Sequence, residues 1–233
     1  MSFSSEHNRN LDDATGSEEE LRRYLREGEH QTQDFKFRID SSLKIAKTLS
    51  AFANTDGGRL LIGVKDNGKV TGVDPEEEYF MIEGAADLYC KPPVPFSAKT
   101  FAYEDKLVLE ISIAPSAERP HFAKEEDGKF WAFVRQDDEN FRANKPLLRF
   151  LRDKTPKSKR KNLVAYGPTE RALFDLLSRE QDTSVSKFAR LAKIPIYRAE
   201  RTLALFLKWD IIGWKATEKG IRFHLAEEET RDF

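Results

Sequence analysis

The sequence predicts an α+β protein: a mixed, largely antiparallel sheet with flanking helices, followed by a small domain of three helices and a β-hairpin. Two observations support this prediction. Segments with strand-like alternation recur through the first 150 residues, between segments whose apolar residues have helical spacing. After a basic run at 154–161, three short helical patterns precede two final strand-like segments. This order of elements is typical of a winged helix, a relative of the helix-turn-helix.

The composition indicates a folded, highly charged protein. Of 233 residues, 39% are hydrophobic and 34% are charged, enough for a core beneath an ionised surface. The single cysteine, Cys90, cannot form an internal disulfide and is expected to be a core thiol. Residues 1–16 are polar, lack the apolar segment of a signal peptide and are expected to be disordered. No apolar run approaches the roughly 20 residues that cross a bilayer. We therefore expect a cytoplasmic protein with no membrane partner.

Local signals define the elements of the first predicted domain, 17–150. Ser17 and Glu20 have the spacing of a capping box, which predicts a helix to about Arg26. The sequence Asp66-Asn67-Gly68 predicts a tight hairpin turn between two strands. The other expected elements are strands over 33–37, 59–65, 69–73, 98–103, 107–113 and 129–134 and helices over 41–53, 75–89 and 145–153.

Charge is divided unevenly along the chain. Residues 1–150 carry a net charge of −7, whereas residues 151–226 carry 17 Lys and Arg against 8 Asp and Glu, a net charge of +9. Such asymmetry indicates modules with different partners. We expect a basic linker over 151–165, a winged helix over 166–226 and an acidic tail over 227–233. The linker is either a solvated tether or an arm that contacts phosphates.

DNA is the expected partner of the winged helix, because the third helix of this fold enters the major groove. The alternative is a module for dimerisation or protein docking. Leu205, which the helical phase places away from the core, suggests a homodimer that would match a palindromic site. The expected nucleic-acid contacts are Tyr197, Arg198, Arg201 and Thr202 on the third helix, Lys215, Lys219 and Arg222 on the hairpin, and Lys157, Lys159, Arg160 and Lys161 in the linker.

The longest motif lies at 47–72 and reads K-T-L-S-A-F-A-N-T-D-G-G-R-L-L-I-G-V-K-D-N-G-K-V-T-G. It resembles the Schlafen-type AlbA domain family, in which a helix ending in A-F-A-N-T-x-G-G leads into a strand ending in I-G-V-x-D-x-G. Asp34-Phe35-Lys36 matches the family's E-F-K, and 131–140 resembles its late strand and polar turn. The motif residues are Asn54, Gly57, Gly58, Gly63, Asp66 and Gly68. The resemblance covers about 17–150 and implies an AlbA-type fold and DNA binding, often with a C-terminal winged helix in bacteria.

The main hypothesis is therefore a bacterial transcriptional regulator, and a metal-dependent nuclease acting on RNA or DNA is the alternative. Relatives that cleave RNA use three acidic residues, which the resemblance places at Glu29, Asp34 and Asp66, with Lys36 nearby. Such carboxylates would hold Mg²⁺ or Mn²⁺ and activate water. This chain departs from the family by having Asp34 in place of the usual glutamate. The competing explanation is that Asp66 serves the hairpin turn and that Glu29 is a solvated loop charge.

A second alternative is a regulator that binds ATP. The Gly57-Gly58 pair follows a helix and precedes a strand, which is the reverse of a phosphate loop, and no G-x-x-x-x-G-K-[ST] motif occurs. A helix C-cap and a tight turn explain both glycines. The four histidines are scattered, so no zinc site is indicated, and no resident cofactor is expected. Aromatic residues such as Phe37 are expected in the core.

Overall fold

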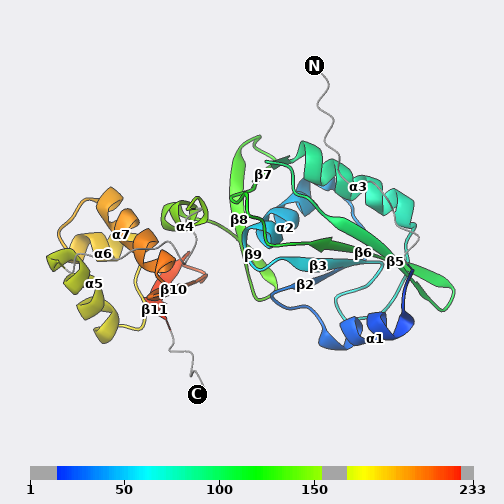
Figure 1. Cartoon of the computed structure of the whole chain (residues 1–233), viewed down its shortest axis with the longest axis horizontal. Helices are drawn as coiled ribbons and strands as arrows, with labels where there is room; N and C mark the ends of the chain where they lie inside the picture. Colours follow the sequence, from blue (N-terminus) through cyan, green and yellow to red (C-terminus); the bar gives the residue numbers. More distant parts are fainter. Residues whose placement is uncertain (1–14, 154–166, 227–233) are drawn as a thin grey trace. The chain divides into compact units, whose positions relative to one another are not determined.

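The computed structural model describes residues 15–153 and 167–226 (Figure 1). The chain forms two compact units, which divide between Arg142 and Ala143. Most of the predicted N-terminal segment, most of the basic linker and the acidic tail lie outside the described residues, as do Lys157, Lys159, Arg160 and Lys161. Among the described helices, none is both long and apolar enough to cross a membrane.

The first unit contains a five-stranded and a four-stranded sheet. Its helices are α1 (Glu18–Glu27), α2 (Ser42–Asn54) and α3 (Pro75–Leu88). The larger sheet has the order β1-β5-β6-β3-β2, from β1 (Thr15–Gly16), β5 (Ser97–Tyr103), β6 (Lys106–Ile113), β3 (Gly58–Ile62) and β2 (Gln33–Lys36). The smaller sheet has the order β4-β7-β8-β9, from β4 (Cys90–Lys91), β7 (Phe122–Lys124), β8 (Phe130–Gln136) and β9 (Glu139–Arg142).

Antiparallel pairing dominates, as predicted. The central strands β5, β6 and β3 pair antiparallel, and every pair of the smaller sheet is antiparallel. Among the described strands, only the outer pairs β1–β5 and β2–β3 are parallel. The expected α+β class, with a largely antiparallel sheet and flanking helices, is confirmed.

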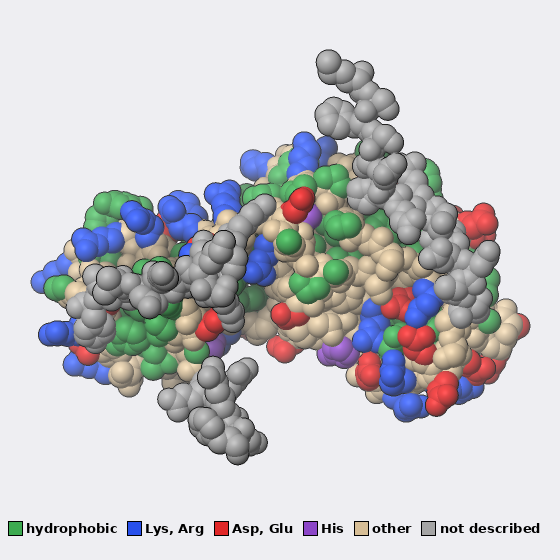
Figure 2. Space-filling view, viewed as in Figure 1, with side chains coloured by type: hydrophobic (Ala, Val, Ile, Leu, Met, Phe, Trp, Pro, Cys, Tyr) green, Lys and Arg blue, Asp and Glu red, His purple; other side chains and the backbone are tan. Residues whose placement is uncertain are grey.

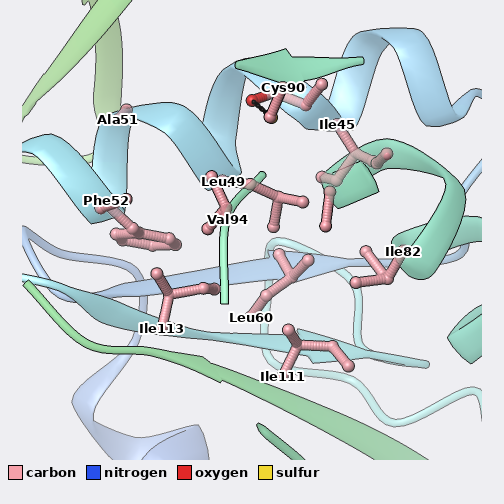
Figure 3. Close-up of a cluster of buried hydrophobic side chains, with 14 of the residues drawn as sticks. Ile45, Leu49, Ala51, Phe52, Leu60, Ile82, Cys90, Val94, Ile111 and Ile113 are labelled. Carbon is pink, nitrogen blue, oxygen red and sulfur yellow. Dashed lines mark hydrogen bonds between the residues drawn. The ribbon is translucent and has the colours of Figure 1, made fainter. Parts of the chain in front are cut away.

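Two apolar clusters cover the two faces of the larger sheet. Because side chains alternate along a strand, Leu60 and Ile62 of β3 pack with α2 and α3, as Figure 3 shows for Leu60. Leu61 points to the opposite face, where it packs with Leu21 of α1 and Phe101 of β5. Helix α2 also packs against β7 and β8 of the second sheet. Accordingly, nine of its thirteen residues are buried, and α2 joins the two sheets.

Local signals set the ends of these helices. The Ser17 hydroxyl accepts a hydrogen bond from the Glu20 amide at 3.2 Å, and Ser41 caps α2 through the Lys44 amide. One predicted element is wrong: no strand forms over 69–73. Instead, Val70 makes an isolated bridge with Val64, because β3 ends at Ile62 and the chain turns sharply at Gly63, where φ is +100°.

Over 143–153 and 167–226, the second unit has four helices and a two-stranded antiparallel sheet. Its elements are α4 (Lys145–Leu151), α5 (Pro168–Arg179), α6 (Val185–Leu191), α7 (Ile196–Lys208), β10 (Ile212–Lys215) and β11 (Arg222–Leu225). Thr183, before α6, adds an isolated bridge to Phe223 of β11. Leu173, Phe188, Leu203 and Phe223, from four different elements, are fully buried.

Helix α4 was expected to close the first domain, but it packs against α7 of the second unit. Its apolar residues Leu147 and Leu151, one helical turn apart, are buried. Ion pairs join the same two segments: the Lys145 ammonium lies 3.6 Å from the Glu200 carboxylate, and Lys208 pairs with Asp153. The segment 154–166 therefore connects two helices of one compact unit.

Candidate nucleic-acid interface

Helix α7 presents one face to the core of the second unit and another to solvent. Leu203, Phe206 and Leu207 are buried, whereas Tyr197 is 61% exposed and Arg198 and Arg201 are exposed. This division follows from the 3.6-residue period of the helix. The outward direction predicted for Tyr197, Arg198 and Arg201 is therefore found in the structure.

Thr202 differs from the expected contact residues, because the structure buries it, with 7% of its surface exposed. It lies on α7 between the outward Arg201 and the buried Leu203, and it contributes to the lining of the groove described next. A hydroxyl with so little exposed surface offers little to an incoming base, and contact of Thr202 with nucleic acid stays a prediction.

A groove of about 490 Å³ lies along α7. Helix α4 contributes Arg149, the segment just after it contributes Asp153, and α7 contributes the larger part of the wall. The α7 residues that line the groove are Tyr197, Arg198, Arg201, Thr202, Ala204, Leu205 and Lys208. Sequence reasoning missed Arg149 and Lys208. The place of Arg149 beside α7 was not predictable while α4 was assigned to the first domain, whereas Lys208 lies at the end of α7 itself.

The groove is cationic. Lys208 is neutralised by Asp153, but within 15–153 and 167–226 no acidic side chain pairs with Arg149, Arg198 or Arg201. Residues 143–226 as a whole carry 19 Lys and Arg against 8 Asp and Glu, and basic side chains are frequent over this unit in Figure 2. We call Arg149, Arg198, Arg201 and Tyr197 the cationic groove. Guanidinium groups without internal partners are suited to bind phosphate or guanine.

The predicted hairpin contacts have a different environment. Lys215 and Arg222 both bind the Asp182 carboxylate, at 2.8 Å each, across the loop before α6. Lys219, in the turn between β10 and β11, is exposed. Two of the three hairpin cations are therefore neutralised inside the unit, and Lys219 is the one that the structure leaves to solvent.

The Asp182 cluster makes the stability of the second unit depend on pH. Hydrogen bonds from Lys215 and Arg222 hold the pKa of Asp182 below its ordinary value of 3.8. A lowered pKa stabilises the fold above that value, and the stabilisation is lost as pH falls through the lowered pKa. We expect Asp182→Asn to lower the melting temperature at pH 6, and the difference from wild type to shrink progressively below pH 3.8.

Fluorescence of Trp214 on β10 would report this transition. The matched control is Asp175→Asn on α5, whose carboxylate is exposed. A difference between wild type and Asp182→Asn that does not change with pH would contradict the role of this cluster.

The predicted acidic residues of the first unit have structural partners. Asp34, on β2, is buried, and its carboxylate lies 2.6 Å from the Lys36 ammonium and 3.2 Å from the Arg135 guanidinium. The Arg135 side chain is fully buried on β8 and also donates to the carbonyl oxygens of His30 and Gln33. Its guanidinium lies over the Phe52 ring, 4.7 Å from the centroid. Asp34 thus forms part of the core between β2, β8 and α2.

Glu29 is close enough to Asp34 and Asp66 to feel the charges of both. The Glu29 carboxylate accepts a hydrogen bond from the Phe35 amide at 2.9 Å. Burial raises the pKa of Glu29, and the charges of Asp34 and Asp66 raise it further. In the part of the chain that the structure describes, no three His, Cys, Asp or Glu side chains are grouped so as to hold a metal ion. The described residues thus show no preformed cluster at these acids, and their role as metal ligands stays a prediction.

The residues of the 47–72 motif serve the architecture. Asn54, at the end of α2, donates to the carbonyl oxygens of His121 and Phe133 at 2.8 Å and accepts from the His121 amide at 2.8 Å. One buried side chain thus links α2 to β8 and to the segment that enters β7. Gly57 has φ of +73°, and a Cβ there would lie 2.6 Å from the Ile113 carbonyl oxygen.

The other glycines have similar reasons. A Cβ on Gly58 would lie 2.4 Å from the Phe52 ring, and Gly63 and Gly68 both have positive φ. Turn geometry and close packing thus account for the glycines, which agrees with the C-cap and turn interpretation and not with a phosphate loop. Phe37 was expected in the core, but it is 49% exposed, because β2 ends at Lys36.

These features define an α+β domain, in which one buried helix joins two sheets, followed by a basic helical unit. The chain belongs to the Schlafen, AlbA_2 family, whose model matches residues 29–144. The match lies almost wholly in the first unit, where it includes the 47–72 motif and Arg135.

Two solved structures resemble this chain at low identity. The crystal structure of the DIP2311 protein from Corynebacterium diphtheriae is 20% identical, with a TM-score of 0.38. The match covers 51% of this chain but only 23% of that one. The N-terminal domain of a RecG-related protein from Nitrosomonas europaea is 21% identical, with a TM-score of 0.38 and coverage of 50% and 87%. A comparison with curated proteins gave no match.

Proposed function

We propose that this protein binds DNA through its second unit and acts as a transcriptional regulator. The observation that carries the proposal is the cationic groove: Arg198 and Arg201 of α7 and Arg149 beside them have no acidic partner among the described residues. The three helices α5, α6 and α7 and the β10–β11 hairpin have the order of a winged helix, in which the third helix enters the major groove.

The chemistry of the groove divides the contacts into two kinds. Arg198 and Tyr197 lie in the first turn of α7, the part of a recognition helix that reaches base edges. An arginine guanidinium can bind O6 and N7 of guanine with two parallel hydrogen bonds. Arg149 comes from α4, a different helix, and a guanidinium at the edge of the groove is placed to bind a backbone phosphate. Lys219 would contact phosphate from the hairpin turn.

Homodimerisation and RNA binding remain predictions. Leu205 is 39% exposed, as the helical phase predicts, but it lines the cationic groove. Bound DNA and a partner subunit would therefore compete for the same side chain. RNA offers phosphates to the same guanidinium groups, so duplex DNA and structured RNA belong in one experiment.

The test mixes the full chain with labelled duplex DNA or structured RNA, with and without Mg²⁺ or Mn²⁺, and follows binding and integrity together. We expect salt-sensitive binding to duplex DNA that leaves the nucleic acid intact, because counterions are released from the phosphates. If the chain binds structured RNA as tightly as duplex DNA, or more tightly, then RNA and not DNA is the partner. Metal-dependent fragments that disappear in Asp66→Ala would establish the nuclease instead.

A further inference from the structure

Helix α3 of the first unit carries a second surface of different chemistry. Phe80, Gly84 and Leu88 follow each other at four-residue intervals, so they lie in one row along the helix. Phe80 and Leu88 are each 71% exposed, the largest values among the exposed large hydrophobic residues. Glu77 and Asp87, on the same side, are also exposed. We call these five residues the α3 face.

The opposite side of α3 already provides what the fold requires. Ile82, Ala85 and Ala86 are fully buried against α2 and the larger sheet, and Figure 3 shows Ile82 in this core. The buried Glu78 accepts a hydrogen bond from the Ile39 amide at 2.8 Å. The α3 face is therefore free to serve another purpose.

Several residues of the α3 face lower the stability of the helix. Glycine within a helix is less favourable than alanine. At Gly84, however, an added Cβ would meet only Ser42, at 3.6 Å or more, which is ordinary contact. Asp87 lies in the last turn, where a negative charge opposes the helix dipole. Residues that lower the stability of a helix and bring the fold no benefit indicate a functional role. Because glycine has no side chain, the row has a gap at Gly84 between Phe80 and Leu88, bordered by Ser42 of α2; we call this gap the notch.

The charge around the notch selects the kind of partner. Residues 70–90 contain six Asp and Glu and no Lys or Arg. Like charges would oppose the packing of one α3 face against another, and phosphates would be repelled for the same reason. A cationic surface is complementary. An amphipathic helix can supply both an apolar side chain for the notch and Lys or Arg for the flanks.

We propose that the α3 face docks a basic amphipathic helix of a partner protein. An apolar side chain of that helix enters the notch over Gly84, between Phe80 and Leu88. Its Lys and Arg residues pair with Glu77 and Asp87. The site differs in chemistry from the cationic groove, and it does not depend on DNA binding.

A model peptide tests the proposal with the full chain. The probe is a fluorescein-labelled helix of about 18 residues, or five turns, patterned with Leu on one face and Lys on the other. Fluorescence anisotropy should show binding that weakens with salt. Phe80→Ser together with Leu88→Ser should reduce the affinity at least about tenfold, because buried apolar anchors dominate such contacts. Gly84→Leu should also weaken binding, although it adds apolar surface, because it fills the notch.

Matched controls distinguish binding at the α3 face from unspecific adhesion of the peptide to the chain. A Leu/Glu peptide of the same pattern should not bind. Glu77→Lys with Asp87→Lys should abolish binding of the Leu/Lys peptide, whereas Glu126→Lys with Asp138→Lys, two exposed acids elsewhere on the first unit, should not. Circular dichroism would verify that each variant is folded.

Three results would overturn the proposal. The first is that the Leu/Lys peptide does not bind wild type, or binds the Phe80→Ser, Leu88→Ser variant equally well. The second is that Gly84→Leu tightens binding, which would indicate unspecific apolar adhesion. The third is a self-association of the wild-type chain, measured by sedimentation, that the double serine variant loses, since the α3 face would then be a contact between copies.

Discussion

Replacing Arg198 and Arg201 of α7 by alanine, singly, is expected to weaken binding to the target DNA about 10- to 100-fold each, corresponding to about 1–3 kcal/mol for a side chain that reads a base. Both side chains are exposed and lack acidic partners among the described residues, so no internal ion pair is broken by the change. Titration of labelled duplex at several salt concentrations would measure the loss.

The salt dependence distinguishes base reading from phosphate contact. If Arg201 binds a phosphate, alanine lowers affinity for all sequences alike and reduces the slope of log affinity against log salt by about one. If it reads a base, discrimination between sequences falls instead. Lysine at the same position retains the charge but not the planar pair of donors, so Arg201→Lys should restore phosphate binding and not base reading.

The matched control is Arg179→Ala, an exposed arginine at the end of α5 that lies outside the cationic groove. It should leave affinity within about twofold, a change of roughly 0.4 kcal/mol. If neither groove variant changes affinity or salt slope, α7 is not the DNA-binding helix and the proposal is wrong.

Replacing Arg135 by methionine is expected to destabilise the first unit by about 3–5 kcal/mol, because it leaves the buried Asp34 carboxylate without one of its two cations. The change also removes hydrogen bonds from the guanidinium to the carbonyl oxygens of His30 and Gln33. Lys36 alone would remain beside Asp34.

Guanidinium denaturation of the full chain would measure this loss, with Trp131 of β8 as the reporter. Trp209→Phe and Trp214→Phe would remove the other two tryptophans, both in the second unit. The control is Arg38→Ala, whose partner Asp40 is exposed, and a surface pair of this kind contributes at most about 1 kcal/mol. An Arg135→Met variant as stable as wild type would show that the pair with Asp34 is dispensable.

Local features of the fold could be predicted because their causes are local. Ser17 and Ser41 are helix caps by residue type, and the positive φ of Gly68 follows from its place in the Asn-Gly turn. The order of helices and strands follows from such signals and from periodicity.

Pairings between distant residues could not be predicted in this way. Asp34 and Arg135 lie 101 residues apart in the sequence, and nothing in the spacing of either indicates the other. The family resemblance implies a metal-ligand role for Asp34, but it does not indicate that Arg135 pairs with this carboxylate. Asp182 likewise neutralises Lys215 and Arg222 from a loop outside the hairpin. The partner of α4 was missed because its Leu147 and Leu151 indicate a buried side but not what covers it.

The hydrogen bonds of Asn54 bear on what a match to the 47–72 motif can say about the function of another protein. Its amide group is used completely inside the first unit, and the glycines that follow it are required by turns and close packing. The 47–72 motif, the most recognisable stretch of the chain, therefore serves to hold the fold of the first unit together. A match to this stretch therefore indicates a shared fold and does not by itself indicate a shared reaction or ligand. Their individual chemistry has to be sought in the exposed side chains of the surrounding elements.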